Sequence, residues 1–169
     1  MARSRSTRRT PNLDRLDDRE RSAVLSKVLH SHPELLAEAD TLATDLLIGI
    51  DPHAVAENVI WALTHLDTND LANRAGPHRG GYVEPNEAAW ELVEEAFEPF
   101  LVDLKRLAEL GHLDAATATA RGALDGLDRL GTPSDGTVLA WAGPDTLDHL
   151  AEAVRCDAAK LGLSVDGDG

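Results

Sequence analysis

Apolar residues recur at steps of three and four along most of the chain, which is the spacing of one face of an α-helix. The longest such run lies between Gly81 and Gly111. Its apolar positions are Trp90, Val93, Phe97, Phe100, Leu104 and Leu107, and its glutamates on another face are Glu87, Glu91, Glu94 and Glu98. The pattern predicts an amphipathic helix with an aromatic stripe for a core and a carboxylate ridge facing water. The aromatic side chains could instead face a groove for a partner helix, although core packing is the favoured interpretation.

Capping signals divide the residues before this run into further helices. Asp17 and Glu20 have the spacing of a capping box, and Pro33 and Pro52 stand where the first turn of a helix accepts proline. Gly49 ends the second of these helices. The expected helices begin near residues 17, 33 and 51, and a brief fourth helix is expected from about 67 to 74. Their short connections predict antiparallel neighbours.

The residues after Gly111 repeat the helical pattern. Leu113 to Leu130 is predicted to form a return helix, whose alanines allow close approach to the helix before it. Trp141 lies in a short helical or irregular piece, and Pro144 opens a last helix that Gly162 ends. Few runs of β-branched residues are present to build a sheet. The chain is therefore predicted to be all-α.

The segment AGPHRGGY, residues 75–82, is predicted to end regular structure, because it contains three glycines and one proline. Gly80 and Gly81 would let the backbone approach a ligand closely. Side chains able to bind a ligand or a partner gather in and beside this loop, and these candidate site residues are Arg74, His78, Arg79 and Tyr82. A small anion is one conceivable ligand. The favoured alternative is a solvated loop whose arginines pair with nearby glutamates.

Charge is distributed unevenly along the chain. The formal net charge is −14 at pH 7, but residues 1–11 hold four arginines and no acid, so all 30 acidic residues lie elsewhere. An acidic surface repels nucleic acid and anionic membranes, so phosphate contacts are expected only through the basic tail or a local basic patch. The low apolar content of residues 1–12 predicts disorder. The expected organisation is this tail, a single all-helical domain over residues 13–162 and a frayed acidic tail over residues 163–169.

The sequence holds few candidates for catalysis or metal binding. The seven histidines do not have metal-ligand spacing, and the central glutamates have the pattern of a solvated face, so we predict no metal, no cofactor and no catalytic residue. The single cysteine, Cys156, excludes an intrachain disulfide, and its helical setting predicts inert packing. The absence of a membrane-length apolar run and of a signal-peptide core predicts a cytoplasmic protein that contacts no membrane. These features favour a binding module and leave the enzyme alternative open.

Two resemblances begin at the central run. Residues 104–127 resemble a tetratricopeptide-like hairpin, in which glycine closes the turn and alanine lets the helices touch. The positions that carry this resemblance are Leu104, Leu107, Gly111, Ala116, Ala123 and Leu127. It covers one repeat unit. The resemblance implies antiparallel helical hairpins, with tetratricopeptide-like or bundle packing.

The second resemblance rests on the segments DPHAVAENVIWALTHLDTNDLANRAG and GYVEPNEAAWELVEEAFEPFLVDLKRLAELG. Together they resemble a helical region of uncharacterised bacterial proteins, some of which carry a SWIM-type zinc finger. The similarity covers residues 51 to about 142. The finger requires several cysteines and a histidine in fixed order, and this chain has one cysteine, so neither zinc nor nucleic-acid binding is implied. The resemblance implies architecture only.

Three functions are compatible with these patterns. The leading hypothesis is an interaction or scaffold module that binds a protein partner, through a concave face between the central helix and residues 74–82. The first alternative is a small regulator that contacts nucleic acid through its arginine-rich tail. The second is an anion-binding or enzymatic protein that uses the Arg74 to Tyr82 loop. The sequence leaves the partner, the biological process and the oligomeric state open.

Overall fold

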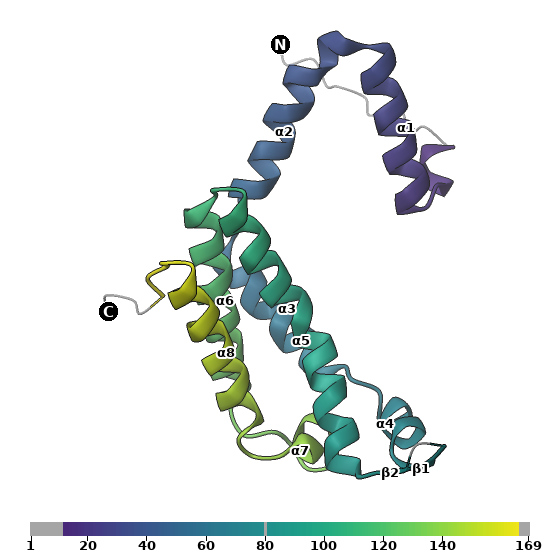
Figure 1. The fold of residues 1–169 in the computed structure, drawn as a ribbon, viewed down its shortest axis with the longest axis vertical. Coiled ribbons are helices and arrows are strands. Elements are labelled where there is room, and N and C mark those ends of the chain that lie inside the picture. The colour runs from purple at the N-terminus through teal and green to yellow at the C-terminus, as the bar shows by residue number, and fades with distance from the viewer. Residues whose placement is uncertain (1–11, 80, 166–169) are drawn as a thin grey trace, which may run out of the picture. The chain divides into compact units, whose positions relative to one another are not determined.

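The computed structural model describes residues 12–79 and 81–165, and for His78 it describes the backbone alone. Over these residues the all-α prediction is confirmed, because the chain is helical apart from its connections and one short sheet. The helices are η1 (Leu13–Arg15), α1 (Asp18–Ser31), η2 (Pro33–Leu35), α2 (Leu36–Ile48), α3 (Pro52–Thr64), α4 (Thr68–Arg74), α5 (Pro85–Glu109), α6 (Leu113–Leu130), α7 (Val138–Ala142) and α8 (Thr146–Lys160); the strands are β1 (Gly76–His78) and β2 (Gly81–Val83) (Figure 1).

The chain divides into two compact units, residues 1–44 and 45–169. The described part of the first unit comprises η1, α1, η2 and most of α2. The single domain expected over residues 13–162 stays a prediction. Two compact units can still unfold together as one cooperative domain. Apart from Asn12, the tail expected to be disordered lies outside the described residues, as do residues 166–169 of the expected C-terminal tail.

The helix starts follow from capping side chains. Asp17 and Glu20 form the expected capping box, in which the Glu20 N–H donates to Asp17 Oδ1 at 2.8 Å and the Asp17 N–H donates to Glu20 Oε2 at 3.1 Å. Asp51 accepts from the His53 N–H at 3.0 Å, with Pro52 in the first turn of α3. Each cap satisfies a backbone donor that has no partner inside its helix.

The second unit is built around α5 and α6, which a short turn joins into a hairpin. Gly111 has a φ of 84°, and the next N–H, that of His112, donates back to the Leu107 carbonyl at 2.9 Å. This backbone reversal places α6 against α5. α5 also contacts α3, α4, α7 and α8, and α6 contacts α3 and α8. The core lies between these helices, and its largest fully buried side chains include Phe97, Leu63, Leu104, Leu107, Val59, Val93, Val138 and Val154.

The contact between α3 and α6 depends on two glycines of α6. A Cβ placed on Gly122 would lie 2.4 Å from the Pro52 carbonyl oxygen, and one on Gly126 would lie 2.8 Å from the Ala56 carbonyl oxygen. Real Cβ atoms are not found so close to backbone atoms, so these glycines set how near the helices come. The buried residues around this contact include Ala56 of α3 and Ala115, Ala116, Ala120 and Ala123 of α6.

Two sequence predictions require correction. Residues 75–82 were expected to lack regular structure, but β1 and β2 pair in antiparallel register, with Pro77 opposite Tyr82 and His78 opposite Gly81. Gly76 and Gly81, at φ 103° and 143°, adopt backbone angles that other residues rarely reach, and this permits the tight hairpin. Cys156 was expected to be packed, but it is exposed, because the buried stripe of α8 is formed by Leu150, Val154 and Ala158.

The residues after α8 fold back onto the core. Gly162 has a φ of 71°, and the Leu163 N–H donates to the Ala158 carbonyl at 2.9 Å, which closes α8 with a Schellman motif. Leu163 is 9% exposed, although the frayed tail was expected to begin at this residue.

No single described helix is long and apolar enough to cross a membrane. Residues 33–48 and α3, taken together as a bent pair, have the length and composition that a membrane span requires.

A candidate partner-binding groove between α5 and α8

Of the candidate residues from the sequence, Arg74 makes the most defined contact. It ends α4, and its Nη1 and Nη2 donate to Oε1 and Oε2 of Glu95 at 2.7 and 2.6 Å. A second carboxylate, that of Glu91, lies 4.0 Å from Nη1. The hydrogen bonds to Glu95 raise the pKa of Arg74, and those from Arg74 lower the pKa of Glu95. Arg74 therefore fastens α4 to the acidic face of α5.

The other three candidates lie on the β-hairpin that follows α4. Tyr82 is 61% exposed in β2, and Arg79 is exposed in the turn. The backbone of His78 lies in β1, while its side chain lies outside the described atoms. The register places His78 and Tyr82 at adjoining positions of one hairpin, whereas the Arg74 side chain is directed to α5.

A groove of about 440 Å³ lies between α5 and α8, which contact each other in the second unit. Its apolar lining comes from both helices and consists of Trp90, Phe97, Leu101, Leu150 and Ala153. The α5 side also contributes four carboxylates, those of Glu91, Glu94, Glu95 and Glu98, all on exposed residues. The ridge that the sequence assigned to open solvent therefore lines an apolar depression.

One end of the groove is closed by an aromatic pair. The rings of Trp90 and His149 meet edge to face, with centroids 5.7 Å apart and an interplanar angle of 84°. His149 Nδ1 lies 2.8 Å from the Asp145 carbonyl oxygen. Because a carbonyl can only accept, Nδ1 must carry the hydrogen in this contact, which fixes the ring and directs Nε2 away from the α8 backbone.

Beyond the aromatic pair lies a second pocket of about 300 Å³, which shares Trp90 and His149 with the groove. Its lining includes Thr146, whose side chain is 2% exposed. Within the described part of the chain, Thr146 Oγ1 has no hydrogen-bond partner. A buried hydroxyl without a partner costs free energy, so a polar ligand atom that reached it would be stabilised.

The sequence indicated this site only in part, because a groove for a partner helix was the less favoured interpretation of the aromatic stripe that includes Trp90. His149 was not associated with that stripe, and the two residues are brought together only by the packing of α8 on α5. The available signal was local to α5, where Glu91, Glu94 and Glu98 recur beside Trp90 at helical spacing. That spacing shows a shared face, but it does not show that a second helix completes a groove there.

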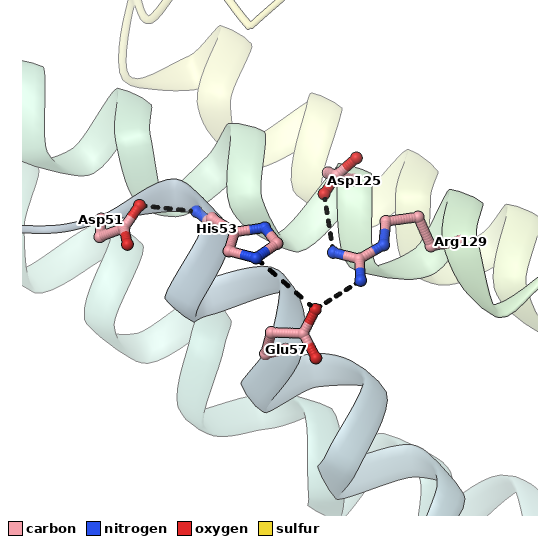
Figure 2. Close-up of polar contacts among 5 residues, drawn as sticks. All are labelled: Asp51, His53, Glu57, Asp125 and Arg129. Atoms are coloured by element: carbon pink, nitrogen blue, oxygen red, sulfur yellow. Dashed lines mark hydrogen bonds and ion pairs between the residues drawn. The ribbon is translucent and has the colours of Figure 1, made fainter.

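A separate polar cluster links the exposed edges of α3 and α6 (Figure 2). Arg129 donates to Glu57 across the two helices and lies 3.4 Å from Asp125 on its own helix, while His53 lies 3.9 Å from Glu57. The hydrogen bond from Arg129 lowers the pKa of Glu57. These groups pair with one another at the surface of the α3–α6 contact, so we assign the cluster a structural role.

Within residues 12–79 and 81–165, no three His, Cys, Asp or Glu side chains are grouped so as to hold a metal ion. In comparison with known proteins, no family model, no curated protein and no solved structure matches the chain. The groove between α5 and α8 is therefore the feature of the described chain that best supports a function.

Proposed function

We propose that the protein is an interaction module that binds a basic amphipathic helical segment of a partner protein in the groove between α5 and α8. The observation that carries the proposal is an apolar groove whose α5 side is lined by four carboxylates, those of Glu91, Glu94, Glu95 and Glu98, of which Glu95 is already paired with Arg74. A helix with one apolar face and flanking lysines or arginines complements such a surface in both shape and charge.

The spacing of the carboxylates supports a helical ligand. Glu91 and Glu98 are separated by two helical turns, or roughly 10 Å along α5 at 1.5 Å per residue. Basic side chains on successive turns of a ligand helix repeat at the same interval. An extended peptide would place alternate side chains on opposite sides and would match this interval less well.

The aromatic end of the groove supports a cationic ligand. Trp90 presents an indole ring beside the Glu91 and Glu94 carboxylates, and a lysine or arginine side chain is attracted both to an aromatic face and to carboxylates. The groove thus distinguishes a basic ligand from an acidic one.

The alternatives from the sequence have less support. An anion bound by the Arg74 to Tyr82 loop would have to displace the bidentate Glu95 carboxylate from Arg74. Nucleic-acid contact through residues 1–11 concerns a segment outside the described residues. No described contact favours either alternative over the groove.

The test uses a synthetic amphipathic helical peptide of leucine and lysine as the probe, with the full chain as receptor. Trp61 and Trp141 are 64% and 52% exposed, so replacing both with phenylalanine leaves Trp90 as the sole tryptophan reporter. Saturable binding should change the Trp90 fluorescence and weaken as salt is raised. A peptide with glutamate in place of lysine should not bind.

Two matched pairs of substitutions separate groove binding from general acidity. Glu94→Gln with Glu98→Gln should weaken lysine-peptide binding by about three- to ten-fold, since each rim contact contributes modestly. Glu109→Gln with Asp114→Asn removes the same charge at exposed positions that do not line the groove, and should leave binding unchanged. Equal weakening by both pairs, or equal binding of the glutamate peptide, would overturn the proposal.

A further inference from the structure

The first unit exposes apolar side chains that a folded protein ordinarily covers. In its described part, residues 12–44, no side chain is buried. Six large apolar side chains of α1, η2 and α2 within this unit are 37–59% exposed, namely Val24, Leu25, Val28, Leu35, Leu36 and Leu42. We call residues 18–44 the open hairpin. Exposed apolar groups are ordinary when scattered, but here they are concentrated on two consecutive helices.

These side chains form a stripe on each helix. On α1, Val24, Leu25, Val28 and Leu29 occupy one face at steps of three and four. On α2, Leu36, Ala39 and Ala43 continue the same spacing, with Leu35 and Leu42 beside them. Stripes of this width are typical of helices that pack in bundles.

The two helices do not cover one another. In Figure 1, α1 and α2 diverge from the η2 connection as the arms of a V. A cleft of about 760 Å³ separates the arms, and its lining includes Leu25 and Leu29 from α1 and Leu36, Ala39 and Ala43 from α2. Both stripes therefore contribute to one unfilled apolar cleft.

The exposed apolar faces of the open hairpin need a packing partner that the hairpin does not itself provide. Isolated helices of this length are marginal in water, and most helical stability in proteins comes from packing of the apolar face. α1 has 14 residues and α2 has 13, and the described part of the unit holds no core that would stabilise either of them. The packing partner of the cleft must be supplied by another helix or helices.

We propose that the open hairpin pairs with the open hairpin of a second copy of this chain, giving a four-helix bundle at the centre of a dimer. Charge supports a second copy as the occupant. α1 carries three bases, Arg19, Arg21 and Lys27, against two acids, Asp18 and Glu20, and Arg21 pairs with Asp18 on the same helix at 3.3 Å. Residues 33–44 carry Glu34, Glu38 and Asp40 and no base. A two-fold axis that sets α1 beside the second copy's α2 places the bases Arg19 and Lys27 near an acidic helix at both symmetric contacts.

The available area suits this occupant. The six large apolar side chains are 37–59% exposed in each copy, and a standard interface buries about 800 Å² per partner, polar atoms included. The flanking charged residues would contribute the polar part of such an interface. In the proposed dimer, an arm of each hairpin would enter the cleft of the other.

The experiment measures the mass of the full chain by sedimentation and by light scattering over a wide concentration range. We expect a concentration-dependent dimer. Leu25→Asp and Leu42→Asp should each raise the dissociation constant at least ten-fold, because each puts a carboxylate into the apolar interface. Leu113→Asp is the matched control, since Leu113 is 50% exposed at the start of α6, and it should leave the dimer intact. Circular dichroism of each variant verifies that the helices persist.

Charge exchange tests the proposed pairing of helices. Lys27→Glu and Glu38→Lys should each weaken the dimer, whereas the double variant exchanges the two signs and should recover most of the lost affinity. A chain that stays monomeric throughout, including at high concentration, overturns the proposal, and so does a dimer that is indifferent to Leu25→Asp and Leu42→Asp. Neither measurement uses the lysine peptide, so failure here is distinguishable from failure of the α5–α8 groove as a binding site.

Discussion

The α3–α6 contact and the open hairpin use apolar residues in opposite ways. α6 carries mostly alanine, glycine and threonine on its buried face, yet this face is covered almost completely, with Ala116 at 0% and Ala120 at 1% exposed. The open hairpin carries leucine and valine, and buries none of them within residues 18–44. In these two regions, burial therefore follows the shape of the facing surface more than the hydrophobicity of the individual side chain.

The physical reason is backbone separation. Gly122 and Gly126 let α6 approach α3 more closely than any side chain would allow at these positions, and nearby alanines such as Ala116 and Ala120 are almost fully removed from water. The arms of the open hairpin diverge, so a leucine on one arm does not span the cleft to the other. The second unit thus has a buried core of its own, whereas the described part of the first unit has none.

The largest expected effect is a difference between the two units under the same kind of truncation. Phe97→Ala removes a side chain that is 0% exposed and should lower the free energy of unfolding by about 3–5 kcal/mol. Leu25→Ala truncates a side chain that is 56% exposed and should change it by about 0.5 kcal/mol or less in dilute, monomeric protein. Urea unfolding at low protein concentration measures both. Similar losses would show that the hairpin is packed in the monomer.

The second prediction concerns the close approach itself. Gly126→Ala should destabilise the protein by about 1–3 kcal/mol, because the added methyl group meets the Ala56 backbone and the Val59 side chain. In most helices the same substitution stabilises, since alanine is the better helix former. Asp128→Ala, at an exposed position of the same helix, is the control and should be neutral or slightly stabilising. Thermal unfolding of both variants decides whether packing or propensity dominates in α6.

The helices could be predicted from the sequence because their signals are local. The capping box at Asp17 and Glu20, the proline after Asp51 and the bounds Leu113 and Leu130 all appear in the structure as expected. The β-hairpin was missed because its glycines and proline are equally typical of an irregular turn. The exposure of α1 and α2 was also outside the reach of a local pattern, since an apolar stripe shows which face needs cover but does not identify what covers it.

The candidate site was less predictable than the fold. Arg74 was identified as a candidate from the glycine-rich segment beside it, and the structure directs its side chain to the carboxylates of α5. Trp90, Thr146 and His149 come from helices separated by the whole of α6, so only tertiary packing reveals their association. The sequence correctly placed the glutamates on one face of α5, but it gave no sign of the wall that α8 provides.

The third prediction uses the buried hydroxyl of the packed unit. Thr146→Val keeps the shape of the side chain and removes the oxygen that has no partner in the described chain, so it should raise the free energy of unfolding by about 1 kcal/mol. Calorimetric unfolding of the variant and of the native protein measures this change. A destabilised variant would show that the hydroxyl has a partner in solution, such as water.

The smallest expected effect is a dependence on pH. Lys105 lies 2.8 Å and Lys160 3.1 Å from the Asp157 carboxylate, and the hydrogen bond from Lys105, more than that from Lys160, lowers the pKa of Asp157. The Asp157 carboxylate therefore makes its full contribution to stability above its unfolded pKa of about 3.9. This contribution is lost as the pH falls through the lower folded pKa of Asp157. Asp157→Asn should be less stable than the native protein at pH 6 and should differ from it less at pH 3. A constant difference in unfolding free energy across this range would contradict the assignment.

The open hairpin also bears on how long the chain survives in a cell. Chaperones and proteases act on exposed apolar segments, and a chain whose V-shaped cleft is unfilled presents two such segments on neighbouring helices. Copies whose cleft has no packing partner would be degraded first, whereas assembled copies would be protected from proteases. The divergence of α1 and α2 would then set the abundance of the protein by its own assembly, without any separate regulator.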